Sequence, residues 1–165
     1  KNIAYTFLGI IYVALPFALL TVLAFIQNET YDPQIVLGCL FLLWASDSGA
    51  YFAGTKFGKT KLFERVSPKK SWEGLIGGLI STIGFSILIS LFFDRFEMFH
   101  WIIISILVVI FGTFGDLVES LFKRSVGIKD SGKIMPGHGG LLDRFDSFLF
   151  TVPIVYAYLV FFELI

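Results

Sequence analysis

Long apolar runs alternate with short polar segments along this chain. The five runs lie at residues 2–28, 34–53, 74–93, 101–122 and 147–165. The first has no charged side chain, and at ~1.5 Å per residue it is long enough to cross the ~30 Å of hydrocarbon in a bilayer. The pattern predicts an all-α fold. We expect a polytopic integral membrane bundle of about five transmembrane helices with two basic loops, forming a single domain over residues 1–165.

The composition agrees with a membrane protein. Of the 165 residues, 56% are hydrophobic and 16% are charged, and the mean hydropathy is +0.81. A soluble domain has about a quarter of its residues charged. The formal net charge is zero, so the distribution of charge is more informative than its total. The single Cys39 lies in an apolar run and is predicted to be a small buried hydrophobe.

Basic residues gather in two of the predicted loops. Eleven of the thirteen Lys and Arg residues lie in segments 54–73 and 123–146. The positive-inside rule places both loops in the cytoplasm. They are the second and fourth of the four loops. Because successive loops of a chain that crosses the membrane repeatedly lie on alternate sides, the second and fourth are expected on the same side, which agrees with this placement. The basic residues stand beside acids near the membrane and form no extended basic face, so no nucleic-acid partner is predicted.

Three carboxylic acids interrupt the apolar runs. Asp47 lies in the second run, and Asp116 and Glu119 lie three residues apart near the end of the fourth, on one helical face. A charge inside a span costs ~2.5–3.5 kcal/mol on insertion scales, so such residues usually face a cavity, a partner or a cation. The alternatives are a hydrogen-bonded packing role for Asp47 and, for the other two, ion pairs with the adjacent basic loop.

The densest polar segment is residues 120–146, with the sequence SLFKRSVGIKDSGKIMPGHGGLLDRFD. Its basic side chains suit phosphate, and its close glycines allow backbone N–H groups to approach an anion. Asp143 and Asp146 are three residues apart at the start of the next helix and so lie on one face. Carboxylates beside bound phosphate indicate a hard cation such as Mg²⁺. The segment therefore predicts a metal–polyphosphate site.

This segment resembles the signature of the phosphatidate cytidylyltransferase (CDP-diacylglycerol synthase) family. The matching elements are Ser120, Lys123-Arg124, Lys129-Asp130, Pro136-Gly137-His138-Gly139-Gly140 and Asp143-Arg144-Phe145-Asp146. Met135 stands where the family usually has Ile or Leu. The sequence around Asp47, WASDSGAYFAGTKFGK, and the segment SPKKSWEG at residues 67–74 also resemble the family. Family members are longer, with further membrane segments before this region, so we expect the chain to be the C-terminal part of a larger enzyme.

The resemblance implies an activity. Such an enzyme transfers the cytidylyl group of CTP to phosphatidic acid and forms CDP-diacylglycerol and pyrophosphate in phospholipid biosynthesis. Its partners would be CTP, phosphatidic acid and membrane lipids, and a homodimer is allowed. Its cofactor would be Mg²⁺, with room for a second cation. We expect a multi-pass protein of a bacterial inner membrane, with an active site that faces the cytoplasm.

The resemblance and the charges together suggest roles for individual residues. The predicted metal ligands are Asp143, Asp146, Asp116 and Asp47, and Glu119 is left open. The predicted catalytic residues are Asp143, Asp146, Lys129 and His138, the last with a loop-structuring role as its alternative. The predicted substrate-binding residues are Lys123, Arg124, Lys70, Ser67, Ser71, Gly139, Gly140 and Arg144.

Three further features predict local structure. Ser67-Pro68 suits a turn that leads into a helix, and Ser71 is expected to cap that helix. Gly74 and Gly78 form a GxxxG pair, which is most often a helix-packing device.

Two other functions remain as alternatives. A CTP-dependent polyprenol or phytol kinase would transfer the γ-phosphate of CTP to a lipid alcohol and release CDP, which would require deprotonation of the alcohol. A cation transporter would use the acidic residues as an ion path. That function predicts polar side chains through the whole membrane depth, whereas the charges in this sequence gather towards one side.

Overall fold

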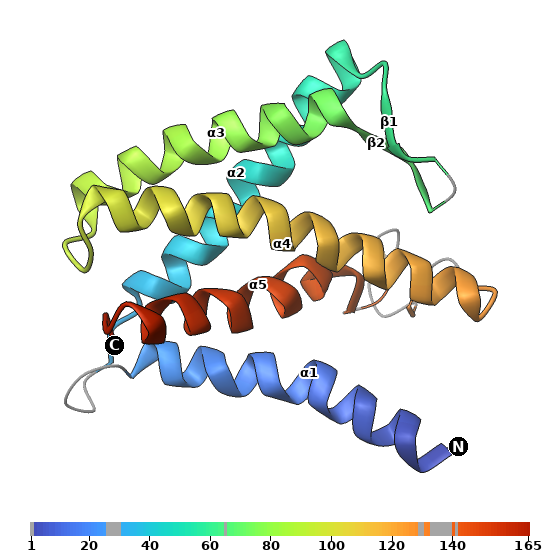
Figure 1. Cartoon of the computed structure of the whole chain (residues 1–165), viewed down its shortest axis with the longest axis horizontal. Helices are drawn as coiled ribbons and strands as arrows, with labels where there is room; N and C mark the ends of the chain where they lie inside the picture. Colours follow the sequence, from blue (N-terminus) through green and yellow to red (C-terminus); the bar gives the residue numbers. More distant parts are fainter. Residues whose placement is uncertain (1, 26–30, 65, 129–130, 133–139, 141) are drawn as a thin grey trace.

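The described residues of the computed structural model form five helices and one β-hairpin (Figure 1). The structure describes all residues of the chain except 1, 26–30, 65, 129–130, 133–139 and 141. The helices are α1 (Asn2–Ala24), α2 (Gln34–Phe57), α3 (Trp72–Phe92), α4 (Met98–Ser125) and α5 (Leu142–Phe161). The strands β1 (Lys61–Phe63) and β2 (Ser67–Ser71) pair antiparallel, with Lys61 opposite Ser71.

Four of the described helices are long and apolar enough to cross a membrane. Their candidate spans are Thr6–Ala24, Gln34–Phe57, Trp72–Phe92 and Met98–Ser125. Helix α5 has a shorter apolar part, Phe145–Phe161. The prediction of an all-α, polytopic membrane bundle is therefore confirmed.

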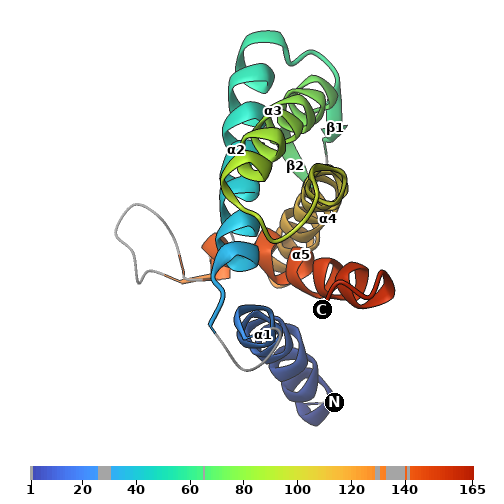
Figure 2. The same ribbon diagram turned by 90° about the vertical axis from the view of Figure 1, so that its left-hand side faces the viewer.

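The helices run back and forth, so successive connections lie at opposite ends of the bundle. Figure 1 shows the hairpin, the end of α4 and the start of α5 on the right, at the same end as the start of α1. The connection from α3 to α4 and the C-terminus lie at the other end. In the turned view of Figure 2, α3 lies above α4 and α5, α2 runs down beside them from the top of the molecule, and α1 lies below them. The described parts of both basic segments thus lie at one end of the molecule.

The interior of the bundle lies mainly between α2, α4 and α5. The fully buried side chains there include Ile35, Val108 and Val152. Cys39 is only 1% exposed, which confirms its prediction as a buried hydrophobe. Trp101 also has no exposed surface, and its ring occupies the space where a Cβ on Gly38 would lie, 2.5 Å from the ring atoms.

The basic segment between α2 and α3 differs from the predicted loop. Helix α2 continues to Phe57, and the hairpin fills most of the remaining segment. The prediction that Ser67-Pro68 turns into the helix is wrong, because both residues lie in β2. A two-stranded sheet has only edge strands, and an edge tolerates a proline that cannot donate a hydrogen bond. The predicted cap is confirmed, since the Ser71 side chain accepts from the Gly74 N–H at 3.1 Å.

Helices α2 and α3 approach each other closely through small residues. A Cβ added at Gly78 would lie 3.0 Å from the Ser46 carbonyl oxygen, and one at Gly74 would lie 3.0 Å from that of Ala50. The predicted packing role of the GxxxG pair is therefore confirmed. The tightest approach is at Gly77, where an added Cβ would lie 2.1 Å from the Ala53 Cβ.

Substituting Gly77 with Ala should lower stability by about 1–3 kcal/mol, because the new methyl group overlaps Ala53 and the two helices must separate. Gly84→Ala is the matched control, since nothing lies within 4 Å of a Cβ at that position of the same helix. The unfolding temperature in detergent measures the stability of both variants. Equal midpoints for the two variants would contradict this account of the α2–α3 contact.

Candidate active site

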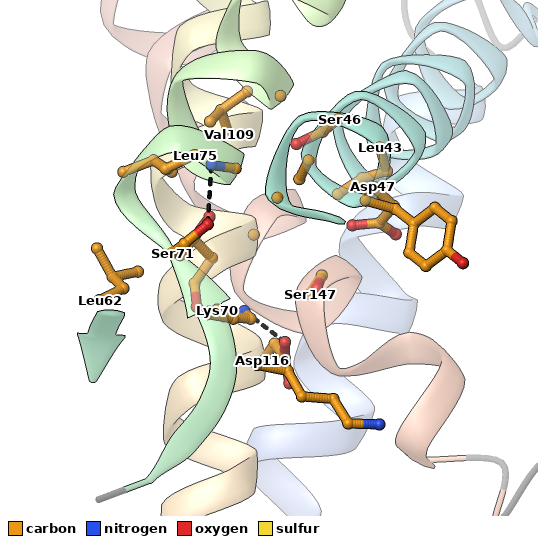
Figure 3. Close-up of a pocket in the computed structure, with 18 residues that line it drawn as sticks. Leu43, Ser46, Asp47, Leu62, Lys70, Ser71, Leu75, Val109, Asp116 and Ser147 are labelled. Atoms are coloured by element: carbon orange, nitrogen blue, oxygen red, sulfur yellow. Dashed lines mark hydrogen bonds and ion pairs between the residues drawn. The ribbon is translucent and has the colours of Figure 1, made fainter. Parts of the chain in front are cut away.

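A pocket of about 220 Å³ opens between α2, α3, α4 and the hairpin (Figure 3). Four glycines, Gly54, Gly74, Gly78 and Gly112, contribute to its wall and leave room because they have no side chains. The polar side chains that line it include Asp47, Lys69, Lys70, Ser71 and Asp116. Four of these, Asp47, Lys70, Ser71 and Asp116, are residues that the sequence predicted for the site, and they come from three separate elements, α2, β2 and α4.

Lys70 joins the hairpin to α4 inside this pocket. Its Nζ forms an ion pair with Asp116 Oδ2, which Figure 3 marks with a dashed line. The same Nζ lies 3.5 Å from the Thr113 carbonyl oxygen. Asp47 extends from α2 into the pocket, and the charges of Lys70 and Asp116 act on it. The pocket therefore holds a lysine paired with a carboxylate of α4, with a second carboxylate from α2 nearby, and an anionic ligand could compete for that lysine.

Beside the pocket, three carboxylates meet between α4 and α5. Asp116, Glu119 and Asp146 each offer an oxygen, and these oxygens all lie within 4.8 Å of one another. We call these residues the acid trio. The helices can come this close because α4 has a glycine at the contact: a Cβ on Gly115 would lie 2.7 Å from the Asp146 carbonyl oxygen. Three ionised carboxylates at this spacing repel one another unless a cation or a proton lies among them.

Glu119 is the member that the sequence left undecided. Its side chain is only 2% exposed. Its Oε2 accepts a hydrogen bond from Lys123 Nζ at 2.9 Å, but its Oε1 is buried and has no partner among the described residues. Carboxylate oxygens are the ligands that Mg²⁺ prefers, and an unsatisfied buried oxygen within the trio gives such an ion a coordination position. The residues present thus fit a divalent cation.

Asp143 lies outside the acid trio. Its Oδ1 accepts from Lys123 Nζ at 2.5 Å. Its Oδ2 accepts from the Ser131 N–H and Oγ, both at 2.9 Å, and from the Gly140 N–H at 2.7 Å. Both oxygens are therefore occupied by groups that hold the described parts of segment 120–146 against the start of α5. The prediction that Asp143 binds metal stays a prediction.

These contacts also determine the ionisation of Asp143, which precedes the apolar part of α5. Burial by itself would raise the pKa of this carboxyl group. The hydrogen bonds from Lys123, Gly140 and Ser131 act in the opposite direction and outweigh burial, so the pKa lies below its ordinary value. Asp143 is consequently an anion at neutral pH. In this form it can accept hydrogen bonds from the lysine and from the two backbone N–H groups through both of its oxygens.

The remaining predicted residues occupy varied positions. Lys123 is 13% exposed and lies between Glu119 and Asp143, whereas Arg124 is exposed in the last turn of α4. Ser67 is partly buried in β2. The predictions for Lys129, His138 and Gly139, and for the side chain of Arg144, fall outside the described residues. Their roles stay predictions.

Comparison with known proteins identifies the family. The profile of the cytidylyltransferase family matches residues 1–162. A phosphatidate cytidylyltransferase of Haemophilus influenzae is 45% identical over 149 residues, which are 84% of this chain and 51% of the relative. Proteins of the same name from Staphylococcus haemolyticus and Staphylococcus aureus are 42% and 41% identical over 154 residues, 92% of this chain and 57% of each relative.

The chain spans about half the length of the curated relatives it matches. The family profile, by contrast, extends over nearly all of this chain and includes the pocket and the acid trio. On the strength of that match, this protein belongs to the cytidylyltransferase family.

Proposed function

We propose that this protein is a phosphatidate cytidylyltransferase, which transfers the cytidylyl group of CTP to phosphatidic acid and releases pyrophosphate. The observation that carries the proposal is the acid trio beside a lysine-lined pocket, at the basic end of a membrane bundle. The names of relatives that are 41–45% identical over most of this chain support the same reaction.

The proposed reaction is a substitution at phosphorus. A phosphate oxygen of phosphatidic acid attacks the α-phosphorus of CTP, and a P–O bond forms. The bond from that phosphorus to the oxygen bridging the α- and β-phosphates breaks, and pyrophosphate leaves with the bonding electrons. The attacking phosphate is already anionic near neutral pH, so a strong general base is not needed. The main barrier is the repulsion between two anionic groups, which positioning and electrostatics reduce.

The pocket residues can supply those electrostatics. Lys69 and Lys70 line the pocket and can bind phosphate oxygens of CTP. Lys70 then exchanges a carboxylate partner, Asp116, for a phosphate partner. Ser71 and the start of α3 also border the pocket. The predicted phosphate ligands Lys129 and His138 belong to the stretch of sequence between the end of α4 and the start of α5.

Metal binding is also part of the proposal. Asp116, Glu119 and Asp146 would hold Mg²⁺, and Asp47 and Asp143 are the further predicted ligands for this ion or a second cation. When bound, Mg²⁺ supplies positive charge that reduces the repulsion between the two phosphates. In the protein itself, Lys123 keeps Glu119 in place through Oε2, while Oε1 has no hydrogen-bond partner among the described residues.

The location follows from the charge distribution. We place the protein in a bacterial inner membrane with its site on the cytoplasmic side, because the described parts of both basic segments lie at one end of the bundle. The relatives named above come from bacteria. A site at the membrane boundary suits a reaction between a water-soluble nucleotide and a membrane lipid. A homodimer stays a prediction.

An isotope experiment tests the reaction. The full-length protein in detergent receives phosphatidic acid, Mg²⁺ and CTP labelled at either the α- or the γ-phosphate. We expect α-label in the lipid product, γ-label in pyrophosphate, and neither transfer when the metal is removed by a chelator. Appearance of γ-label in lipid when a polyprenol replaces phosphatidic acid would support the kinase alternative. Failure to transfer either label from well-folded protein would reject both reactions.

A further inference from the structure

Tyr12 is a polar residue in a helix that is mostly exposed and apolar. Most described side chains of α1 before Tyr12, such as Phe7, Leu8 and Ile11, are exposed. The Tyr12 hydroxyl oxygen, in contrast, is buried and has no hydrogen-bond partner among the described residues. Its ring packs edge-on against Phe150 of α5, with ring centroids 5.8 Å apart. Phe150 is four residues after Asp146, so the two lie on the same face of α5.

The charged surroundings of this hydroxyl group include two members of the acid trio and the lysine beside them. The groups that act on it electrostatically are Glu119, Asp146 and Lys123. Glu119 Oε1 is the second buried polar atom without a described partner in this region. Buried polar groups in folded proteins are nearly always hydrogen-bonded. One such atom comes from α1, near Glu119 and Asp146, and the other is an oxygen of Glu119 itself. Together they indicate that the site binds something that satisfies both.

We propose that Tyr12 is a positioning residue of the acid trio, whose hydroxyl group donates a hydrogen bond to an oxygen in the coordination shell of a divalent cation held there. The accepting oxygen belongs to a carboxylate of the trio, a water or a phosphate, and each of these can accept from a phenol. This inference rests on the proposed metal–phosphate site and adds a residue from α1 to it. Hydrogen bonds of this kind fix the orientation of metal ligands.

The direct test is Tyr12→Phe, which keeps the ring against Phe150 and removes only the hydroxyl group. Mn²⁺ binding to the full-length protein in detergent, followed by electron paramagnetic resonance without CTP or lipid, is the readout. We expect about tenfold weaker binding, the lower end of the effect of outer-shell partners. The unfolding temperature without metal should be unchanged. In turnover, the Mg²⁺ concentration for half-maximal rate should rise more than kcat falls.

Tyr156→Phe is the matched control. It removes the same atom from α5, about 15 Å along the helix from Asp146, and should leave Mn²⁺ affinity unchanged. Equal Mn²⁺ affinity in Tyr12→Phe and wild type would overturn the inference, as would an equal loss in both variants. A wild-type protein that binds no Mn²⁺ would overturn the inference together with the cation site. If Mn²⁺ binds but neither CTP label reaches lipid, the proposed reaction fails, while the affinity comparison still decides the role of Tyr12.

Discussion

Replacing Asp146 with Asn is expected to lower kcat/KM for CTP by about two to three orders of magnitude, the typical loss when one main electrostatic contact of a reacting group is removed. The variant keeps the shape of the side chain but removes a negative charge and a hard oxygen ligand from the acid trio. Steady-state turnover with saturating phosphatidic acid and Mg²⁺ measures the loss. Part of it should be recovered at higher Mg²⁺ concentration, because the other two carboxylates remain.

Loss of stability should not explain this result. Removing one of three adjacent carboxylates relieves repulsion, so without metal Asp146→Asn should unfold at the same or a higher temperature than wild type. The control is Glu97→Gln, which makes the same charge change at an exposed position just before α4, at the opposite end of the bundle. Full activity in Asp146→Asn, or an equal loss in Glu97→Gln, would contradict the assignment of the trio.

Replacing Lys123 with Met is expected to destabilise the protein by about 3–5 kcal/mol, the usual cost of removing one partner from a buried ion pair. Lys123 Nζ contacts both Glu119 and Asp143 and joins α4 to the start of α5. Methionine keeps an unbranched apolar stem, so the change mainly removes charge and leaves two carboxylates without their lysine. Thermal unfolding in detergent measures the effect.

The adjacent Arg124 is the matched control. It carries the same charge but is exposed, so Arg124→Met should change stability by less than about 0.5 kcal/mol. Similar unfolding temperatures for the two variants would contradict the buried position of Lys123. If Lys123→Met instead raised KM for CTP without any change in stability, the sequence-based assignment of Lys123 as a phosphate ligand would be favoured over its role as an internal ion-pair partner.

The sequence determined the class of fold and the end of the molecule that carries the candidate site. Apolar runs of sufficient length can hide their backbone polar groups from lipid only as helices, so they predict spans directly. The two basic segments are the second and fourth connections between the apolar runs. Successive connections of a chain that crosses a membrane repeatedly lie on alternate sides, so the sequence predicted that both segments lie on the same side. Ser71 and the Gly74–Gly78 pair also followed from local chemistry, since a cap and a small-residue contact each depend on a short sequence pattern.

The hairpin could not be recognised in the same way. Strands β1 and β2 are three and five residues long, too short for a clear alternation of polar and apolar positions. Their pairing also joins residues ten positions apart, such as Lys61 and Ser71. The basic side chains gave no indication of this pairing, because a run of lysines is equally typical of a solvated loop.

Only the tertiary structure decided which carboxylates meet. Helical periodicity placed Asp143 with Asp146, and Asp116 with Glu119, but it cannot say which neighbour each face meets. That depends on helix rotation and separation, which packing sets: at Gly115 the absence of a side chain brings Asp146 against α4. Asp143, one turn earlier, instead meets Lys123 and Ser131. Likewise, no local signal in α1 distinguishes Tyr12, because its role depends on a helix more than a hundred residues later in the chain.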